Sequence, residues 1–136
     1  MAEANHKKSG GCLCGAVRYD VTGPLRDVIL CHCGQCRRQH GSFGAYSEAA
    51  LADVDIRDGG GLAWFESSAR ARRGFCRHCG SGLFWQRPGG ATTSIAAGSL
   101  DQPTGLAVVR HIYVADKADF YEIGDRLPQL PGSQIR

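Results

Sequence analysis

Hydrophobic and polar residues alternate along several short stretches of this chain, which is the pattern of half-buried β-strands. The clearest example places apolar Val17, Tyr19 and Val21 between polar Arg18 and Asp20. A glycine–proline pair follows and predicts a turn. A strand is therefore expected over residues 16–21.

Further strands are expected where short apolar or β-branched runs lie between glycine-rich turns. They are expected at residues 28–30, 41–46, 54–56, 62–66, 83–85, 92–97 and 106–114, with a last short strand or turn at 120–123. Residues 33–40 suit a turn or short helix, and the alanine-rich residues 47–53 favour a helical turn. Residues 67–73 are polar and arginine-rich, which indicates a connecting segment. The predicted fold class is mainly β, with many short strands.

Composition narrows the class of protein. A chain of 136 residues with 43% hydrophobic content has the length and apolar fraction of one ordinary globular domain. The formal net charge of +3 is mildly basic and falls short of a nucleic-acid-binding signature, so no nucleic-acid partner is expected.

The predicted organisation is a flexible N-terminal tail at residues 1–10, a single domain at 11–124 and a C-terminal tail at 125–136. The N-terminal residues are polar, with no apolar stretch of the kind a signal peptide needs, and no segment approaches a membrane span. A cytoplasmic protein without a membrane partner is expected, in which cysteines stay reduced.

Seven cysteines carry the candidate chemistry. An odd number fits a disulfide framework badly, and closely spaced thiols suit zinc or an iron–sulfur centre. They fall into a Cys-x-Cys pair, a triplet and a Cys-x-x-Cys-Gly knuckle: Cys12 and Cys14; Cys31, Cys33 and Cys36; Cys76 and Cys79. In an extended backbone, residues two apart point to the same side, so Cys12 and Cys14 can chelate one ion.

The three groups can be combined in two ways. The first joins Cys12 and Cys14 to Cys76 and Cys79 as a closed structural zinc site, and leaves the triplet with three ligands and an open position, the pattern of catalytic zinc. The second joins Cys33 and Cys36 to the knuckle as a zinc ribbon and strands the other three thiols. The first grouping uses every cysteine and is preferred.

The histidines decide whether the triplet stays open. His32 lies between two of the triplet cysteines, so its ring should point away from the metal in extended backbone. His78 is expected to be exposed, and His111 to be a satisfied core group or a partner of a ligand. Any of these, or His40, could instead supply a fourth ligand and close the site.

The sequence also resembles a known family. The stretches 11–19, 31–37 and 75–81, together with 97–101, 110–114 and Lys117, are similar to the glutathione-dependent formaldehyde-activating enzymes, in order and over about residues 10–124. The resemblance extends to centromere protein V, whose role is chromosomal.

This resemblance implies an Mss4-like fold, in which short twisted antiparallel sheets are pinned by zinc. It implies two zinc ions per chain, with Cys12, Cys14, Cys76 and Cys79 structural and Cys31, Cys33 and Cys36 at the reaction site. The family's activity is a carbon–sulfur lyase-type reaction that condenses formaldehyde with glutathione to S-hydroxymethylglutathione. A small thiol such as glutathione and an aldehyde are the expected partners.

Two further expectations stay open at this stage. Glutathione carries carboxylates that guanidinium groups bind well, and the candidate arginines are Arg37, Arg38, Arg77 and Arg110, although each taken singly is better explained as solvated surface charge. The alternative function is a zinc-stabilised binding module without turnover, in which both metal sites are closed.

Overall fold

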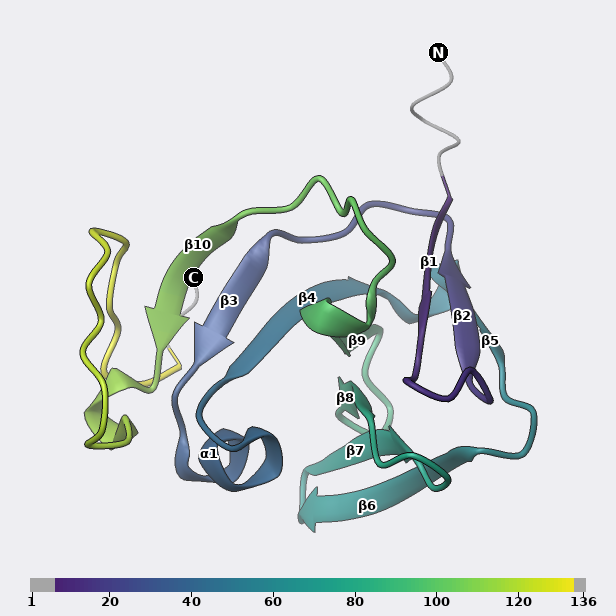
Figure 1. The fold of residues 1–136 in the computed structure, drawn as a ribbon, viewed down its shortest axis with the longest axis horizontal. Coiled ribbons are helices and arrows are strands. Elements are labelled where there is room, and N and C mark those ends of the chain that lie inside the picture. The colour runs from purple at the N-terminus through teal and green to yellow at the C-terminus, as the bar shows by residue number, and fades with distance from the viewer. Residues whose placement is uncertain (1–6, 134–136) are drawn as a thin grey trace. The chain divides into compact units, whose positions relative to one another are not determined.

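The structure is a computed structural model that describes residues 7–133 (Figure 1). Its strands are β1 (Lys8–Gly11), β2 (Arg18–Val21), β3 (Val28–Cys31), β4 (Gly44–Ala50), β5 (Val54–Arg57), β6 (Leu62–Ser68), β7 (Ala71–Cys76), β8 (Gly82–Gln86), β9 (Thr92–Ala96) and β10 (Val108–Ile112). Helix α1 (Gly34–His40) is joined by the 3-10 turns η2 (Leu51–Asp53), η3 (Ala97–Ser99) and η4 (Val114–Asp116).

The mainly β prediction is confirmed, and strands occur at all eight places where a strand was expected without an alternative. One strand pair departs from the expected antiparallel arrangement, because β10 runs parallel to β3. A flexible tail was expected at residues 1–10, but Lys8 to Gly10 belong to β1 and pair with β2. The rest of that tail, residues 1–6, and residues 134–136 lie outside the described part.

Three local predictions were wrong or incomplete. Residues 47–50 continue β4 instead of forming a helical turn, and only Leu51–Asp53 is helical. Strand pairing on a half-buried surface outweighs the helix propensity of alanine here. Residues 67–73 form the end of β6 and the first half of β7, joined by a tight turn in which Ser68 faces Ala71. Residues 120–123 contain no strand.

The arginines expected in a connecting segment pack against the sheet. The Arg72 guanidinium lies 3.9 Å from the centroid of the Trp64 ring and donates a 2.9 Å hydrogen bond to Gln86. Arg73 is buried. Arginine can bury its aliphatic stem and stack its planar head on an aromatic ring, so a strand can carry it on either face.

The described chain forms two compact units. The first unit comprises the residues up to 26 together with residues 47–105, and the second comprises 27–46 and the residues from 106 onward. The described residues of both units include no helix long and apolar enough to span a membrane.

The first unit contains an antiparallel sheet in the order β1–β2–β5 and a run of neighbouring strands β9, β8, β7 and β6. Its core includes Val17, Tyr19 and Val21, the apolar positions of the predicted alternating strand. The Tyr19 ring packs edge-on against Phe84 with centroids 5.3 Å apart. The predicted inward face of β2 is therefore confirmed.

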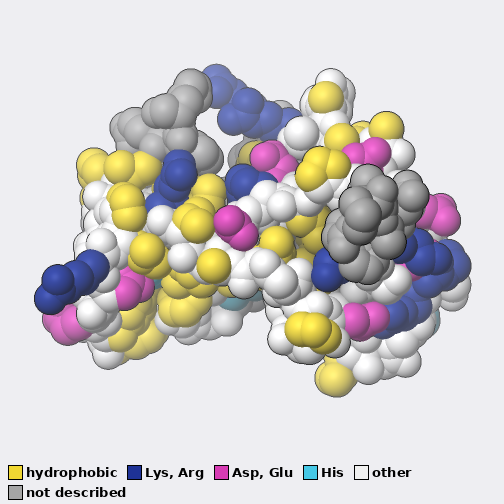
Figure 2. Space-filling model, turned by 90° about the horizontal axis from the view of Figure 1, so that it is seen from above, with side chains coloured by type: hydrophobic (Ala, Val, Ile, Leu, Met, Phe, Trp, Pro, Cys, Tyr) yellow, Lys and Arg dark blue, Asp and Glu magenta, His cyan; other side chains and the backbone are white. Residues whose placement is uncertain are grey.

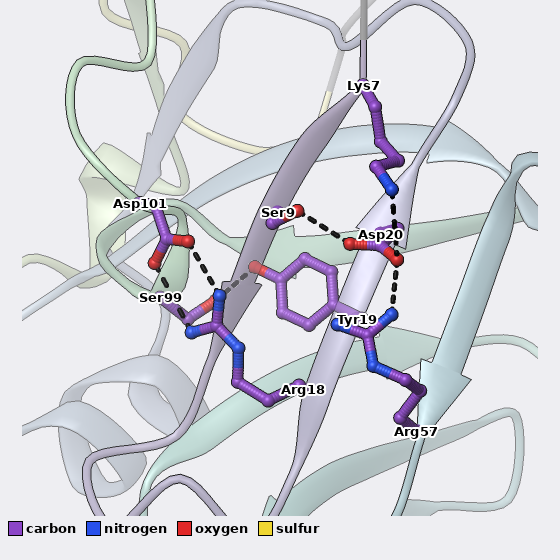
Figure 3. Close-up of polar contacts among 8 residues, drawn as sticks. All are labelled: Lys7, Ser9, Arg18, Tyr19, Asp20, Arg57, Ser99 and Asp101. Atoms are coloured by element: carbon purple, nitrogen blue, oxygen red, sulfur yellow. Dashed lines mark hydrogen bonds and ion pairs between the residues drawn. The ribbon is translucent and has the colours of Figure 1, made fainter.

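Polar contacts tie β2 to its neighbours on both sides (Figure 3). Tyr19 shares a 2.6 Å hydrogen bond with the Ser99 hydroxyl, and Arg18 forms a 2.7 Å ion pair with Asp101. Asp20, although on a nominally polar position, is buried and accepts hydrogen bonds from Ser9 and Arg57. These contacts connect the first sheet to the loop after β9.

In the second unit β3 lies between β4 on one side and β10 on the other, and α1 starts three residues after β3 ends (Figure 1). The segment 128–132 runs beside β10. The His111 amide donates to the Pro128 carbonyl, and the Leu130 amide donates to the His111 carbonyl, both at 2.9 Å. The segment is thus held to β10 by backbone hydrogen bonds although it carries no regular strand.

The surface carries both signs of charge. On the face shown in Figure 2, acidic side chains lie among the lysines and arginines. Interspersed charges of this kind provide solubility without creating a strong field of one sign.

Candidate metal centres

The first unit brings together the thiols of Cys12, Cys14, Cys76 and Cys79, whose sulfur atoms all lie within 4.8 Å of one another. Cys12 and Cys14 occupy the turn between β1 and β2, while Cys76 ends β7 and Cys79 lies in the turn before β8. The Cys14 sulfur lies 3.7 Å from the sulfurs of both Cys12 and Cys76. Four sulfurs in this arrangement fit a tetrahedral zinc ion.

Backbone groups hold this four-cysteine cluster in shape. The Val17 amide donates a 3.3 Å hydrogen bond to the Cys12 sulfur, and the Gly80 amide donates a 2.7 Å hydrogen bond to the Cys76 carbonyl. A hydrogen bond from the Ser81 side chain lowers the pKa of the Cys79 thiol to about 5. Amide and hydroxyl donors around a sulfur favour the thiolate, the form that binds metal.

The second unit brings together Cys31, Cys33 and Cys36, again with all three sulfurs within 4.8 Å. Cys31 is the last residue of β3, Cys33 caps the start of α1, and Cys36 is buried in the first turn of α1. The Cys36 amide donates a 3.3 Å hydrogen bond to the Cys33 sulfur. The end of a strand and the start of a helix therefore aim three thiols at one point.

The acidities of the three thiols depend on one another. Hydrogen bonds from Cys31 and Cys36 lower the pKa of the Cys33 thiol to about 2, and the same hydrogen bond to Cys33 raises the pKa of Cys31 above its ordinary value. An electron-rich sulfur set of this kind is the donor chemistry that zinc prefers.

Close packing surrounds the triplet. A Cβ atom at Gly44, the first residue of β4, would lie 3.1 Å from the Cys36 sulfur and 2.6 Å from a Tyr46 ring carbon. Only a residue without a side chain leaves both groups in place. The phenol of Tyr46 in turn makes a 2.7 Å hydrogen bond with His40.

The structure forms the first of the two groupings considered for the cysteines. Among the described residues, no histidine, aspartate or glutamate belongs to either cysteine cluster. His78 is exposed in the first unit, and the ring of His40 contacts Tyr46. His32 is buried and contacts Tyr121 and His111 through its two ring nitrogens.

The candidate arginines differ in their surroundings. Arg37 and Arg38 lie in the last turn of α1, next to Cys36. Arg77 belongs to the first unit, where its guanidinium lies 3.5 Å from the Leu62 carbonyl. Arg37 and Arg38 are therefore the two candidates that share an element with the triplet.

Sequence analysis did not identify several residues next to the triplet. Tyr121 and Asp125 complete the hydrogen bonds of His32 and His111, and the ring of Phe43 lies 5.4 Å from that of His32. Tyr121 lies in the predicted short strand or turn at 120–123 and Asp125 in the predicted C-terminal tail, and neither pattern pointed to a contact with the histidines. The only available signal was the pair of histidines at 32 and 111, each of which would need a polar partner if buried.

Known proteins resemble this chain in sequence and in fold. The model of a family described as "Glutathione-dependent formaldehyde-activating enzyme" matches residues 7–116. A Schizosaccharomyces pombe protein, named as an uncharacterized lyase, is 27% identical over 128 residues, which cover 93% of this chain and 92% of the relative.

A crystal structure of a Rhodobacter sphaeroides protein is similar in fold. It superposes with a TM-score of 0.58 at 29% sequence identity, and the match covers 71% of this chain and 91% of the other.

Proposed function

Because the chain belongs to the family of glutathione-dependent formaldehyde-activating enzymes, we propose that it joins a small thiol to an aldehyde at Cys31, Cys33 and Cys36. The preferred pair of substrates is glutathione and formaldehyde. The observation that carries the proposal is the difference between the two clusters. One has four sulfurs, and the other has three sulfurs in the described part of the chain.

The donor sets suit one zinc ion each. Four thiolates complete a tetrahedral shell, which is the arrangement of structural zinc, whereas three protein ligands leave a position for an exchangeable group. Bound there, zinc would supply a positive charge that lowers the pKa of a thiol or polarises a carbonyl oxygen. The two clusters thus divide between pinning the fold and binding a reactant.

The proposed reaction is an addition that needs no oxidant or reductant. The sulfur of the thiol substrate forms a bond to the aldehyde carbon, the carbon–oxygen π bond breaks, and the proton lost from sulfur ends on the oxygen. The three cysteines contribute by fixing the position of the thiol substrate, because holding two reactants in place supplies much of the rate gain for such a step. Arg37 and Arg38 are suited to hold a substrate carboxylate.

The deciding experiment follows exchange between free and thiol-bound formaldehyde by carbon-13 NMR, with the reduced, zinc-loaded protein present in catalytic amounts. We expect the wild-type protein to accelerate exchange. Cys36→Ser should abolish the acceleration and retain the zinc of the four-cysteine cluster. The matched control is Ser94→Cys, which adds a thiol to β9 outside both clusters and should leave exchange unchanged.

An opposite result would favour a binding module instead. If the wild-type protein holds two zinc ions but exchange stays at the rate of the protein-free solution, the proposed reaction is wrong. Native mass spectrometry with glutathione then asks whether the triplet binds a thiol at all. A mass increase equal to one glutathione that disappears in Cys36→Ser would show binding without turnover.

A further inference from the structure

A continuous chain of hydrogen bonds starts at His32, the residue between two of the triplet cysteines. Its Nε2 atom lies 2.9 Å from Nδ1 of His111, and Nε2 of His111 lies 3.0 Å from Oδ2 of Asp125. On the other side, Nδ1 of His32 contacts the phenol of Tyr121. Both imidazoles are buried, whereas the Asp125 side chain is 45% exposed.

The chemistry of these groups gives the chain one direction. A carboxylate only accepts hydrogen bonds, so Nε2 of His111 donates to Asp125. With neutral rings, Nδ1 of His111 then accepts from Nε2 of His32, and Nδ1 of His32 accepts from the Tyr121 hydroxyl.

Tyr121 and Asp125, the two ends of this series of hydrogen bonds, are themselves held in place. Lys117 donates to the carbonyls of Ala118 and Tyr121, and its ammonium lies 4.6 Å from the centroid of the Tyr121 ring. The Leu127 amide donates a 3.0 Å hydrogen bond to Asp125. Tyr121 and Asp125 are thus anchored by their own segment and not only by the histidines.

Fixing His32 also fixes its neighbours. The His32 amide donates a 3.0 Å hydrogen bond to the Ile112 carbonyl, and both ring nitrogens have partners. A residue held by its amide and by both ends of its ring has little freedom in its backbone or side-chain torsions. The backbone from which the Cys31 and Cys33 side chains extend, on either side of His32, is therefore held in place.

We propose that Tyr121, His32, His111 and Asp125 are positioning residues that hold Cys31 and Cys33 in the geometry needed to bind a metal ion. In consequence, the segment 117–127 controls how tightly the triplet binds its metal, although none of its residues is a ligand. This inference rests on the proposed metal site and not on the proposed reaction. Partners that orient metal ligands typically change metal affinity by about 10- to 100-fold.

The first test measures cobalt binding to the reduced full-length protein, with Co²⁺ as a coloured substitute for zinc. Competition with a chelator gives separate dissociation constants for the four-cysteine and three-cysteine sites. Tyr121→Phe, which removes one hydroxyl, and His111→Phe, which keeps a ring, should each weaken the three-cysteine site by about 10- to 100-fold. The visible absorption bands of that site should shift, and the four-cysteine site should not change.

Asp119→Asn is the matched control, because Asp119 is an exposed carboxylate on the same segment outside the hydrogen-bond chain. It should leave both dissociation constants at their wild-type values. An unchanged three-cysteine site in Tyr121→Phe and His111→Phe overturns the proposal. Equal weakening of both sites also overturns it, because the variants would then act through the stability of the whole fold.

A second test uses nitrogen-15 NMR of labelled histidines in the zinc-loaded protein. Both His32 and His111 should carry their proton on Nε2, as the direction of the hydrogen bonds from Tyr121 to Asp125 requires. A proton on Nδ1 of His32 would contradict the proposed direction. These results are separable from the reaction: cobalt held normally without formaldehyde exchange refutes only the reaction, whereas a wild-type triplet that binds no cobalt refutes both.

Discussion

Cys14 and Cys76 lie 62 residues apart in the sequence, yet their sulfur atoms are 3.7 Å apart. One belongs to the turn between β1 and β2, and the other ends β7. A shared metal ion would therefore join two parts of the first unit that are far apart in the sequence. Closing so long a loop is entropically costly, so the ion would contribute strongly to the fold.

The first prediction is that Cys76→Ser unfolds the protein while Cys31→Ser does not. Structural zinc contributes on the order of 10 kcal/mol in small zinc-dependent folds, comparable to the whole stability of a domain at about 5–15 kcal/mol. Near-ultraviolet circular dichroism and zinc content measure the outcome. A folded Cys76→Ser protein with one zinc ion would show that the four-cysteine cluster does not pin the fold.

The second prediction concerns removal of metal by a chelator. The three-cysteine site has fewer protein ligands, so we expect it to lose its ion first, with loss of formaldehyde exchange and retention of the fold. Loss of the second ion should coincide with unfolding. Zinc content and circular dichroism followed in the same sample separate the two steps. Simultaneous loss of both ions with the fold would contradict this order.

The third prediction concerns alkaline pH and Tyr19. Burial raises the pKa of Tyr19 to about 12, above the ordinary tyrosine value of about 10. The folded state therefore keeps this proton more strongly than the unfolded state does. The corresponding stability is fully present below pH 10 and is lost as the pH rises from about 10 towards 12.

Urea unfolding at a series of pH values tests this loss. Wild type should lose on the order of 2 kcal/mol across that window, whereas Tyr19→Phe should lack this part of the decline. At neutral pH Tyr19→Phe should be less stable by about 1 kcal/mol, because its hydrogen bond to Ser99 is removed. Tyr113→Phe is the control that retains the buried phenol. A parallel decline in Tyr19→Phe would count against this assignment.

The fourth prediction is that Gly44→Ala damages the triplet. The added methyl group would lie 3.1 Å from the Cys36 sulfur and closer still to Tyr46, so β4 or α1 must shift. Overpacking of this kind costs about 1–3 kcal/mol, and cobalt affinity of the triplet should fall. Gly98→Ala is the control, because a methyl group there meets no atom within 4 Å. Unchanged cobalt binding in Gly44→Ala would show that the triplet tolerates the displacement.

Much of the fold could be predicted because strand signals are local. Alternation at Val17, Tyr19 and Val21 identified β2 and its inward face, and glycine-rich turns marked the other strands. Where two local signals competed, the prediction failed: alanine at 49 and 50 suggested a helix, but pairing within the sheet decided the structure. Local composition does not determine which distant strands pair with one another.

The grouping of the cysteines was accessible from spacing, whereas the surroundings of the triplet were not. Spacing within each cysteine group limits which sulfurs can meet. A cluster of four and a cluster of three together use all seven cysteines, which favoured that grouping. The roles of Tyr121 and Asp125 depend on how residues 113–132 fold back along β10, through backbone hydrogen bonds that no side-chain pattern encodes. The two cysteine clusters were therefore predictable, and the residues that surround the triplet were not.

The backbone pairing of segment 128–132 with β10 has one more consequence. The Leu130 amide donates to the His111 carbonyl, so its proton should exchange with deuterium slowly for a residue so near the end of the chain. The exchange rate of this single amide would report whether the segment is docked on β10, before any metal is added. Faster exchange at Leu130 would reveal loosening around His111 in a protein whose overall melting temperature is unchanged.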